Sequence, residues 1–121
     1  MAAKRKVKAR VRTSANRLPP GSRASRATVT FTVSLTALPG RQAALEREIR
    51  RLIRPTRAEP GCITYILHRS IDKPRRLFLY EAWANRAALE RHWQSPHFLR
   101  WKKRQGAVVD TYERCFWDPV A

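Results

Sequence analysis

Residues 28–36 read TVTFTVSLT, in which hydroxyl-bearing and apolar side chains alternate without interruption. Successive side chains of a β-strand point to opposite faces, so this period of two predicts a strand with one apolar face. That face is formed by Val29, Phe31, Val33 and Leu35. This strand is the first element of the chain, and the turn residues after it mark where the next element begins.

A helix is expected after the turn at Pro39-Gly40. Apolar residues then recur at the i, i+4, i+7, i+8 spacing of one helix face, as Leu45, Ile49, Leu52 and Ile53. Pro55 lacks a backbone donor and crowds the preceding turn, so we expect the helix to kink or end near Arg54. One further turn is the alternative, because the next breaker is Pro60-Gly61.

A β-hairpin follows. Residues 62–69 (CITYILHR) and 77–83 (LFLYEAW) are rich in β-branched and aromatic residues, which favour strands. The residues Asp72-Lys73-Pro74 between them are typical of a turn. The two segments therefore predict a pair of hydrogen-bonded strands.

Two short helices and a last strand complete the chain. Asn85 is a favourable N-cap for a helix that carries Trp93. Ser95-Pro96 supplies a new N-cap and first-turn residue for a second short helix, which we expect Gly106 to end. Residues 108–117 predict the final strand.

The order β-α-β-β-α-β predicts one α+β domain with a ferredoxin-like fold, an antiparallel sheet with helices on one face. The other face is then expected to be apolar and uncovered. A second copy of the chain is the simplest cover, because two-fold dimers are the commonest assembly. In this strand order Cys62 and Cys115 lie on opposite sheet edges and cannot pair within one chain.

The formal net charge of +17 is unevenly distributed. Residues 1–26 hold nine of the 26 Lys and Arg residues and no acid, so residues 27–121 carry 17 basic and nine acidic side chains. A segment with one sign of charge and no hydrophobic periodicity predicts a disordered tail over 1–26, followed by the folded domain over 27–121. Nucleic-acid binding by this tail would be non-specific and salt-dependent. The alternatives are a solvated extension, a transit peptide, or a translation start downstream.

The composition predicts a cytoplasmic protein without a membrane partner. Its apolar runs are far shorter than the roughly 20 residues that cross a bilayer. Two cysteines without metal-ligand spacing indicate reduced thiols, and no apolar signal segment is present. A Gly-rich phosphate loop is also missing, which argues against a bound nucleotide.

Four motifs occur in order along the predicted elements: LPG (38–40), TRAEPGC (56–62), LYEAW (79–83) and, after Leu89, SPHF (95–98). With them the chain resembles the antibiotic biosynthesis monooxygenase family from residue 28 to about residue 117. The resemblance implies a dimeric α+β barrel with an apolar pocket between sheet and helices. Family members of established activity oxidise polycyclic phenols, hydroquinones or quinols with molecular oxygen, often without flavin, haem or metal.

Haem degradation, which other branches of similar proteins perform, is disfavoured. Those branches use an Asn on the first strand, a Trp on the second helix and a His ten positions later. Trp93 matches the Trp, but Lys103 stands ten positions on, and the first strand contains no Asn.

Three residues are candidates for catalysis. His97 lies in the SPHF motif, in the opening turn of a helix, where backbone N–H groups favour a neutral imidazole that can act as a base; a surface or capping histidine is the alternative. His68 and Glu81 lie on the two hairpin strands and are expected to face the pocket. For Glu81 a structural hydrogen bond or salt bridge is the favoured alternative.

Four aromatic residues are candidates for substrate binding: Trp83, Trp93, Phe98 and Tyr65. Large aromatic side chains at strand or helix spacing are more often core than ligand platforms, so packing is the alternative reading of each. No metal site is predicted, because His92 and His97, five residues apart across Ser95-Pro96, do not share one helix face. No cofactor is expected either.

The resemblance, with the candidate residues above, implies a small homodimer that acts as a cofactor-independent monooxygenase on a quinol-like or polyphenolic small molecule and O2. Two alternatives remain open at this stage. One is a non-catalytic, small-molecule-binding or stress-associated dimer, and the other is an isomerase on the same barrel.

Overall fold

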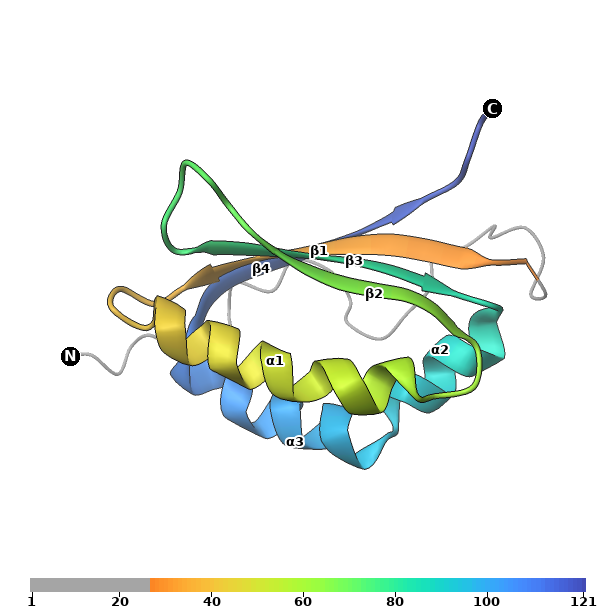
Figure 1. Ribbon diagram of the computed structural model, residues 1–121, viewed down its shortest axis with the longest axis horizontal. Coiled ribbons are helices and arrows are strands. Elements are labelled where there is room, and N and C mark those ends of the chain that lie inside the picture. Colours follow the sequence, from red (N-terminus) through yellow and green to blue (C-terminus); the bar gives the residue numbers. More distant parts are fainter. Residues whose placement is uncertain (1–26) are drawn as a thin grey trace.

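The computed structural model describes residues 27–121 and contains one antiparallel sheet with helices on a single face (Figure 1). The elements in chain order are β1 (Val29–Ala37), α1 (Gln42–Arg57), β2 (Cys62–Arg69), β3 (Arg76–Trp83), α2 (Arg86–Trp93), α3 (Pro96–Arg104), η3 (Gln105–Ala107) and β4 (Val109–Trp117). The spatial strand order is β2-β3-β1-β4, so β1 lies at the centre of the sheet. The predicted ferredoxin-like fold is confirmed.

The alternation along β1 places its apolar residues on the helix side. Phe31, Val33 and Leu35 are buried, whereas the threonines and the serine between them are only partly covered. In the antiparallel register Phe31 lies opposite Glu81 on β3 and Phe116 on β4. The inward-facing residues of β3, β1 and β4 therefore lie side by side in one layer on the helix side of the sheet.

Helix α1 ends at Arg57, one turn beyond Arg54, with Pro55 inside it. Pro55 has no N–H to donate to the Arg51 carbonyl, so the last turn lacks one backbone hydrogen bond, but the helix continues through it. Regular bonding resumes at once, since the Ala58 N–H donates to the Arg54 carbonyl at 3.2 Å. Of the two possibilities open from the sequence, the further turn is the one that occurs.

Both predicted caps of the later helices are present. The Asn85 side chain accepts a hydrogen bond from the Ala88 N–H at 2.9 Å at the start of α2. The Ser95 hydroxyl accepts one from the Phe98 N–H at 3.3 Å at the start of α3, with Pro at the first helical position. Helix α3 ends at Arg104, two residues earlier than Gly106 suggested, because a 3₁₀ turn follows it.

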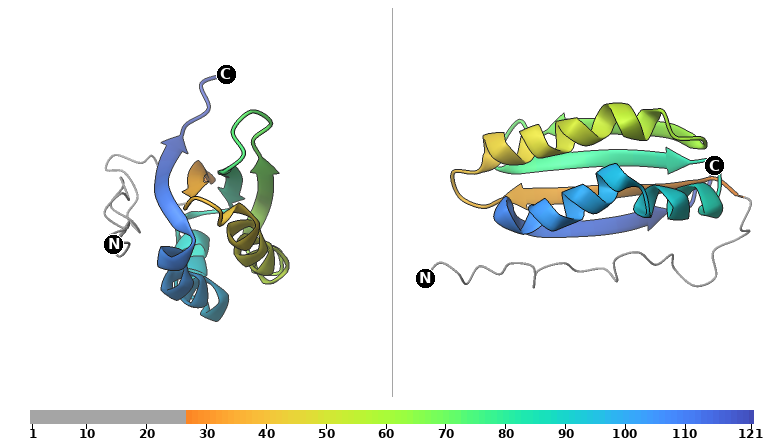
Figure 2. Two further views of the ribbon diagram at one scale, coloured as in Figure 1. Left: turned by 90° about the vertical axis from the view of Figure 1, so that its left-hand side faces the viewer. Right: turned by 90° about the horizontal axis from the view of Figure 1, so that it is seen from below.

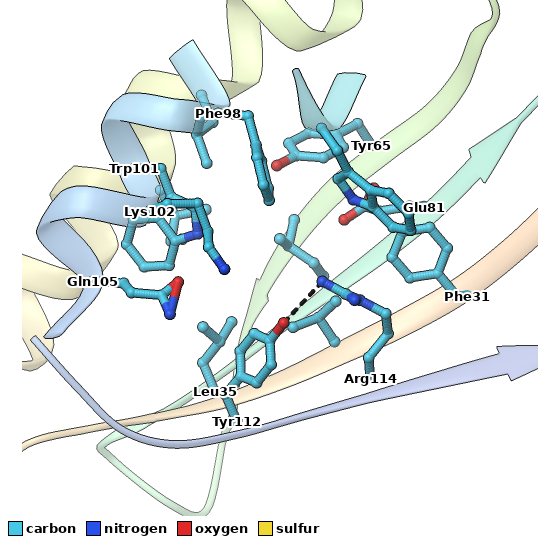
Figure 3. Close-up of a pocket in the computed structure, with 15 residues that line it drawn as sticks. Phe31, Leu35, Tyr65, Glu81, Phe98, Trp101, Lys102, Gln105, Tyr112 and Arg114 are labelled. Carbon is cyan, nitrogen blue, oxygen red and sulfur yellow. Dashed lines mark hydrogen bonds between the residues drawn. The ribbon is translucent and has the colours of Figure 1, made fainter. Parts of the chain in front are cut away.

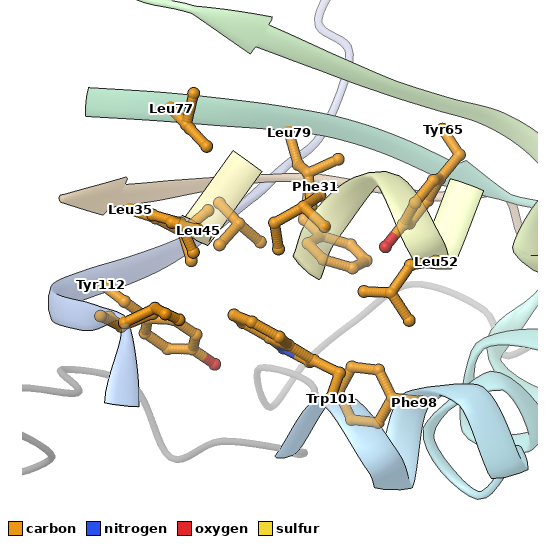
Figure 4. Close-up of a cluster of buried hydrophobic side chains, with 14 of the residues drawn as sticks. Phe31, Leu35, Leu45, Leu52, Tyr65, Leu77, Leu79, Phe98, Trp101 and Tyr112 are labelled. Atoms are coloured by element: carbon orange, nitrogen blue, oxygen red, sulfur yellow. The ribbon is translucent and has the colours of Figure 1, made fainter. Parts of the chain in front are cut away.

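The hydrophobic core lies between the sheet and the helices. Figure 2 shows the helices along one side of the sheet, and Figure 4 shows the side chains that fill the space between them. Phe31, Leu35 and Leu79 from the sheet meet Leu45 and Trp101 from the helices. Burial of this layer is the main favourable term in forming the fold.

The sheet face that points away from the helices is more polar than expected. Along β1 it presents Thr30, Thr32, Ser34 and Thr36, all partly covered. Exposed aromatic residues flank them, Tyr80 on β3 and Trp117 on β4. The prediction of an apolar outer face is therefore wrong for the central strand.

Cys62 and Cys115 are free and lie on the two edge strands, as the strand order required. Among residues 27–121 no helix is long and apolar enough to cross a membrane. The predicted basic tail over 1–26 lies outside the described residues.

Candidate functional site

A small pocket opens between the inner sheet face and helix α3 (Figure 3), with an interior volume of about 30 Å³. We call it the helix–sheet pocket. Its wall is mostly aliphatic and aromatic, from Phe31, Val33, Leu35, Ile49, Leu52, Leu79, Trp93, Phe98 and Trp101. The polar side chains that line it are Tyr65, Glu81, Lys102, Gln105, Tyr112 and Arg114. An apolar cavity with a few convergent polar groups is the usual form of a small-molecule site.

Glu81 is buried in this pocket at the end of β3. Trp83, two residues along the same strand, donates an indole hydrogen bond to Glu81 Oε1 at 3.0 Å. Burial raises the pKa of Glu81 to about 7, although the Trp83 bond and the Arg114 charge both lower it. A carboxyl with this pKa exchanges a proton near neutral pH, as a general base or acid requires.

Arg114 brings a buried positive charge to the same space. Its guanidinium donates to the Tyr112 hydroxyl at 2.8 Å and lies 5.2 Å from the centre of the Trp93 ring and 5.8 Å from that of Phe31. The surrounding aromatic faces favour a cation and restrict its movement. A guanidinium held in this way can stabilise an anion that forms in the pocket.

Tyr65 and Lys102 complete the polar lining. Burial raises the pKa of the Tyr65 hydroxyl well above its ordinary value. Burial, and then the Arg114 charge, lower the pKa of the Lys102 ammonium. Figure 3 shows these two side chains, with Glu81 and Arg114, directed toward one common space. The pocket therefore offers a proton acceptor and two positive groups around one small volume.

A second polar group lies behind one wall of the pocket. Glu59 Oε2 is 2.8 Å from His92 Nδ1 and 2.5 Å from His97 Nε2. We call these three residues the Glu59 cluster. The His92 ring packs against Phe98 at 5.0 Å and Tyr65 at 5.9 Å between ring centres, and both of these residues line the pocket. Burial lowers the pKa of His92, against the raising effect of Glu59.

Several of the predicted site residues come together. Glu81, Tyr65, Trp93 and Phe98 all line the helix–sheet pocket. Trp83 is fully buried and contributes its hydrogen bond to Glu81 rather than a wall of the pocket. The structural hydrogen bond considered for Glu81 is therefore present, and the carboxyl faces the cavity as well.

The two candidate histidines lie elsewhere. His97 is in the Glu59 cluster and is not among the residues that line the pocket. His68 is exposed, and its Nδ1 lies 3.3 Å from the Phe78 carbonyl oxygen. The expectation that His68 faces the pocket is wrong: Tyr65 and Leu67 turn inward on β2, so the alternation directs His68 to the opposite face.

No metal site was predicted because His92 and His97 do not share one helix face, but the structure brings both histidines to one acidic residue. His92 and His97 lie on different helices, but those helices meet at a corner where Glu59 reaches both. Glu59 is 33 residues from His92 and 38 residues from His97 in the sequence, so the periodicity of a single helix cannot predict these contacts.

Arg114 was missed for a different reason. It shares the inner face of β4 with Tyr112, two residues earlier, so the strand's alternation already carried the signal of an inward charge. Lys102 was missed because it lies in a run of basic residues that resembles a solvated helix end.

Comparison with known proteins supplies the family. The model of the antibiotic biosynthesis monooxygenase family matches residues 28–104. Rv0793 of Mycobacterium tuberculosis, which is named as a candidate monooxygenase, is 38% identical over 71 residues, 59% of this chain and 69% of its own.

Solved structures agree with this match. The crystal structure of PA3566 from Pseudomonas aeruginosa is 35% identical, with a TM-score of 0.76 over 82% of this chain and 100% of its own. SnoaB from Streptomyces nogalater, described as a cofactor-independent oxygenase, shares the fold at 24% identity and a TM-score of 0.70, over 78% of this chain and 95% of its own. This protein belongs to the antibiotic biosynthesis monooxygenase family.

Proposed function

We propose that the protein is a monooxygenase that oxidises a quinol-like or polyphenolic small molecule with O2, without flavin, haem or metal in the reaction. The observation that carries this proposal is the buried carboxyl of Glu81, whose pKa is raised to about 7, in an apolar pocket that also holds Arg114. Membership of a family of generally cofactor-independent monooxygenases supports it.

Glu81 takes the first proton in this scheme. Its carboxylate accepts the phenolic proton, and the resulting phenolate is electron-rich enough to reduce O2. Arg114 and Lys102 stabilise the negative charge, first on the phenolate oxygen and then on the reduced oxygen species. For a hydroquinone, one oxygen atom enters the ring and the other leaves as water, and the substrate supplies all four electrons.

The size of the pocket sets a condition on binding. An interior of about 30 Å³ has room for one or two molecules of the size of water or O2, but not for an aromatic ring. Phe98, Trp101 and Lys102 all come from α3, so outward movement of this one short helix enlarges the cavity. Substrate entry thus displaces the α3 side chains, and their return excludes water during the reaction.

The remaining candidate residues take supporting roles. Trp93, Phe98 and Tyr65 form the walls against which an aromatic substrate stacks. Trp83 holds Glu81 in place through its indole hydrogen bond. His97 acts on the pocket only through the Glu59 cluster, and we assign no part in the reaction to His68.

The assembly and location are part of the same proposal. Two copies associate through the outer sheet face, where Tyr80 and Trp117 remain exposed in the single chain. We place the homodimer in the cytoplasm. Any contact with nucleic acid is limited to a non-specific one by the basic N-terminal segment.

Oxygen consumption tests the reaction. Purified, metal-free protein is mixed with a panel of hydroquinones and anthrone-like phenols, and autoxidation is subtracted. We expect turnover with at least one member, loss of it in Glu81→Gln, and full activity in His68→Ala, which alters an exposed histidine on the opposite face. No turnover with any member would refute the proposal; substrate binding without oxygen uptake would instead indicate a non-catalytic binding dimer.

A further inference from the structure

The Glu59 cluster brings two imidazoles and one carboxylate to a single point. Glu59 comes from the loop between α1 and β2, His92 from the end of α2 and His97 from the first turn of α3. Their ligand atoms, one from each residue, all lie within 4.8 Å of one another. Each side chain is thus supplied by a separate segment and directed to the same small volume.

The backbone around the cluster is held firmly. The Ser95 hydroxyl donates to the His92 carbonyl at 2.7 Å and caps α3, which fixes the corner between the two helices. Gly61, beside the Glu59 loop, has a φ of +90°, and a Cβ there would lie only 2.5 Å from that of Ala88. The loop can therefore pack directly on α2, and Glu59 reaches the histidines from a defined position.

The donor set is typical of a transition-metal site. Two imidazole nitrogens and one carboxylate oxygen are the protein ligands of catalytic zinc and of non-haem iron sites, in which the other coordination positions remain open. Imidazole ligands also favour zinc, cobalt, nickel or iron over magnesium and calcium. Among the described residues this is the one group of three such ligands.

The present distances are close to those that an ion needs. Ligand atoms bound tetrahedrally to zinc lie about 3.4 Å apart, from bond lengths of roughly 2.0–2.2 Å. The two contacts of Glu59 Oε2 are now 2.8 and 2.5 Å, so each widens by less than about 1 Å when the ion replaces the protons between them.

The cluster is sheltered from bulk water but remains accessible. The His92 side chain is 1% exposed, whereas His97 and Glu59 are 18% and 14% exposed. Trp83 and Phe98 pack on the His92 ring with centres 4.7 and 5.0 Å away. An ion can enter from the side of His97 and be held against an apolar wall.

We propose that Glu59, His92 and His97 form a binding site for one divalent first-row transition-metal ion per chain, with water in the remaining positions. The site is separate from the helix–sheet pocket, and the ion takes no part in the proposed oxidation. The inference therefore does not rest on the proposed activity, which is tested in metal-free protein.

Metal titration of untagged, chelator-treated protein tests the site. Cobalt binding is followed by its visible absorption and zinc binding by calorimetry. We expect one ion per chain, displacement of cobalt by zinc, and a cobalt spectrum without a thiolate charge-transfer band, because no cysteine belongs to the cluster. A thiolate band, or no uptake of either ion, would overturn the proposal.

Matched variants locate the ion. The chain has three histidines, so His68→Ala is a control that removes the one outside the cluster. Glu59→Gln and His97→Ala remove partly exposed ligands, and circular dichroism checks that each variant is folded. We expect both to weaken binding by at least about 100-fold, since loss of an outer-shell partner alone costs 10–100-fold, whereas His68→Ala binds as the wild type does. Equal affinity in the folded ligand variants and the wild type would contradict the site.

Discussion

Replacement of Glu81 by Gln is expected to change how the stability of the protein depends on pH. The pKa of Glu81 is raised from an ordinary 4.5 to about 7, chiefly by burial. Between pH 4.5 and about pH 7, Glu81 therefore keeps its proton in the folded protein but has lost it in the unfolded chain. Stability falls as the pH rises through this window, and the loss is complete above about pH 7.

The size of the effect follows from the shift. A difference of about 2.5 pKa units at 1.36 kcal/mol per unit gives at most about 3.4 kcal/mol. Between pH 5 and pH 8, which covers most of the window, the loss is about 2 to 3 kcal/mol. Gln keeps the shape of the protonated acid and cannot ionise, so the variant should not show this part of the pH dependence.

Urea denaturation at pH 5 and pH 8, at one fixed protein concentration, measures the effect. We expect the free energy of unfolding of Glu81→Gln minus that of the wild type to be about 2 to 3 kcal/mol higher at pH 8 than at pH 5, because only the wild type loses stability over this range. Asp72→Asn, an exposed change in the turn between β2 and β3, is the matched control. A constant difference between Glu81→Gln and wild type at both pH values would show that Glu81 ionises normally and would refute the reasoning.

Three other changes have defined outcomes. Gly61→Ala meets both a left-handed φ and the 2.5 Å clash with Ala88, so thermal denaturation should show a loss well above the roughly 1 kcal/mol expected for Gly40→Ala, where φ is +76° and nothing lies within 4 Å. Equal losses would rule out the close packing. Ser95→Ala removes the α3 cap and should cost about 1 kcal/mol of unfolding free energy in urea; an unchanged midpoint would argue against the cap. Arg114→Met should lower the rate of oxygen consumption by about 10²-fold or more. It should also move the rising limb of the pH–rate profile to higher pH, because the Arg114 charge lowers the pKa of Glu81. An unchanged rate would exclude Arg114 from charge stabilisation.

Most of the fold could be predicted because it is encoded locally. The strict alternation over residues 28–36 defines the central strand, and Asn85 and Ser95 define where two helices begin. Each of these signals acts over a few residues. Pro55 was ambiguous because its effect depends on how many turns follow it, and here the helix ends two residues later.

The candidate site was predicted only in part because its geometry is long-range. Glu81, Tyr65 and Phe98 share the inner layer with the core, so strand and helix periodicity could find them. Glu59 meets His92 and His97 only because a loop and a helix corner are folded together. The prediction for His68 failed for a local reason. Adjacent residues of a strand face opposite sides, so an error of one residue in the alternation along β2 assigns His68 to the pocket side instead of the outer face.

Isotope labelling tests the proposed oxygenation most directly. Metal-free protein is given ¹⁸O2 and a hydroquinone that supports oxygen uptake, and the product is analysed by mass spectrometry. We expect one ¹⁸O atom per product molecule with the wild type and no product above autoxidation with Glu81→Gln. An unlabelled quinone formed together with hydrogen peroxide, or equal rates in the two proteins, would contradict a monooxygenase that uses Glu81 as its base.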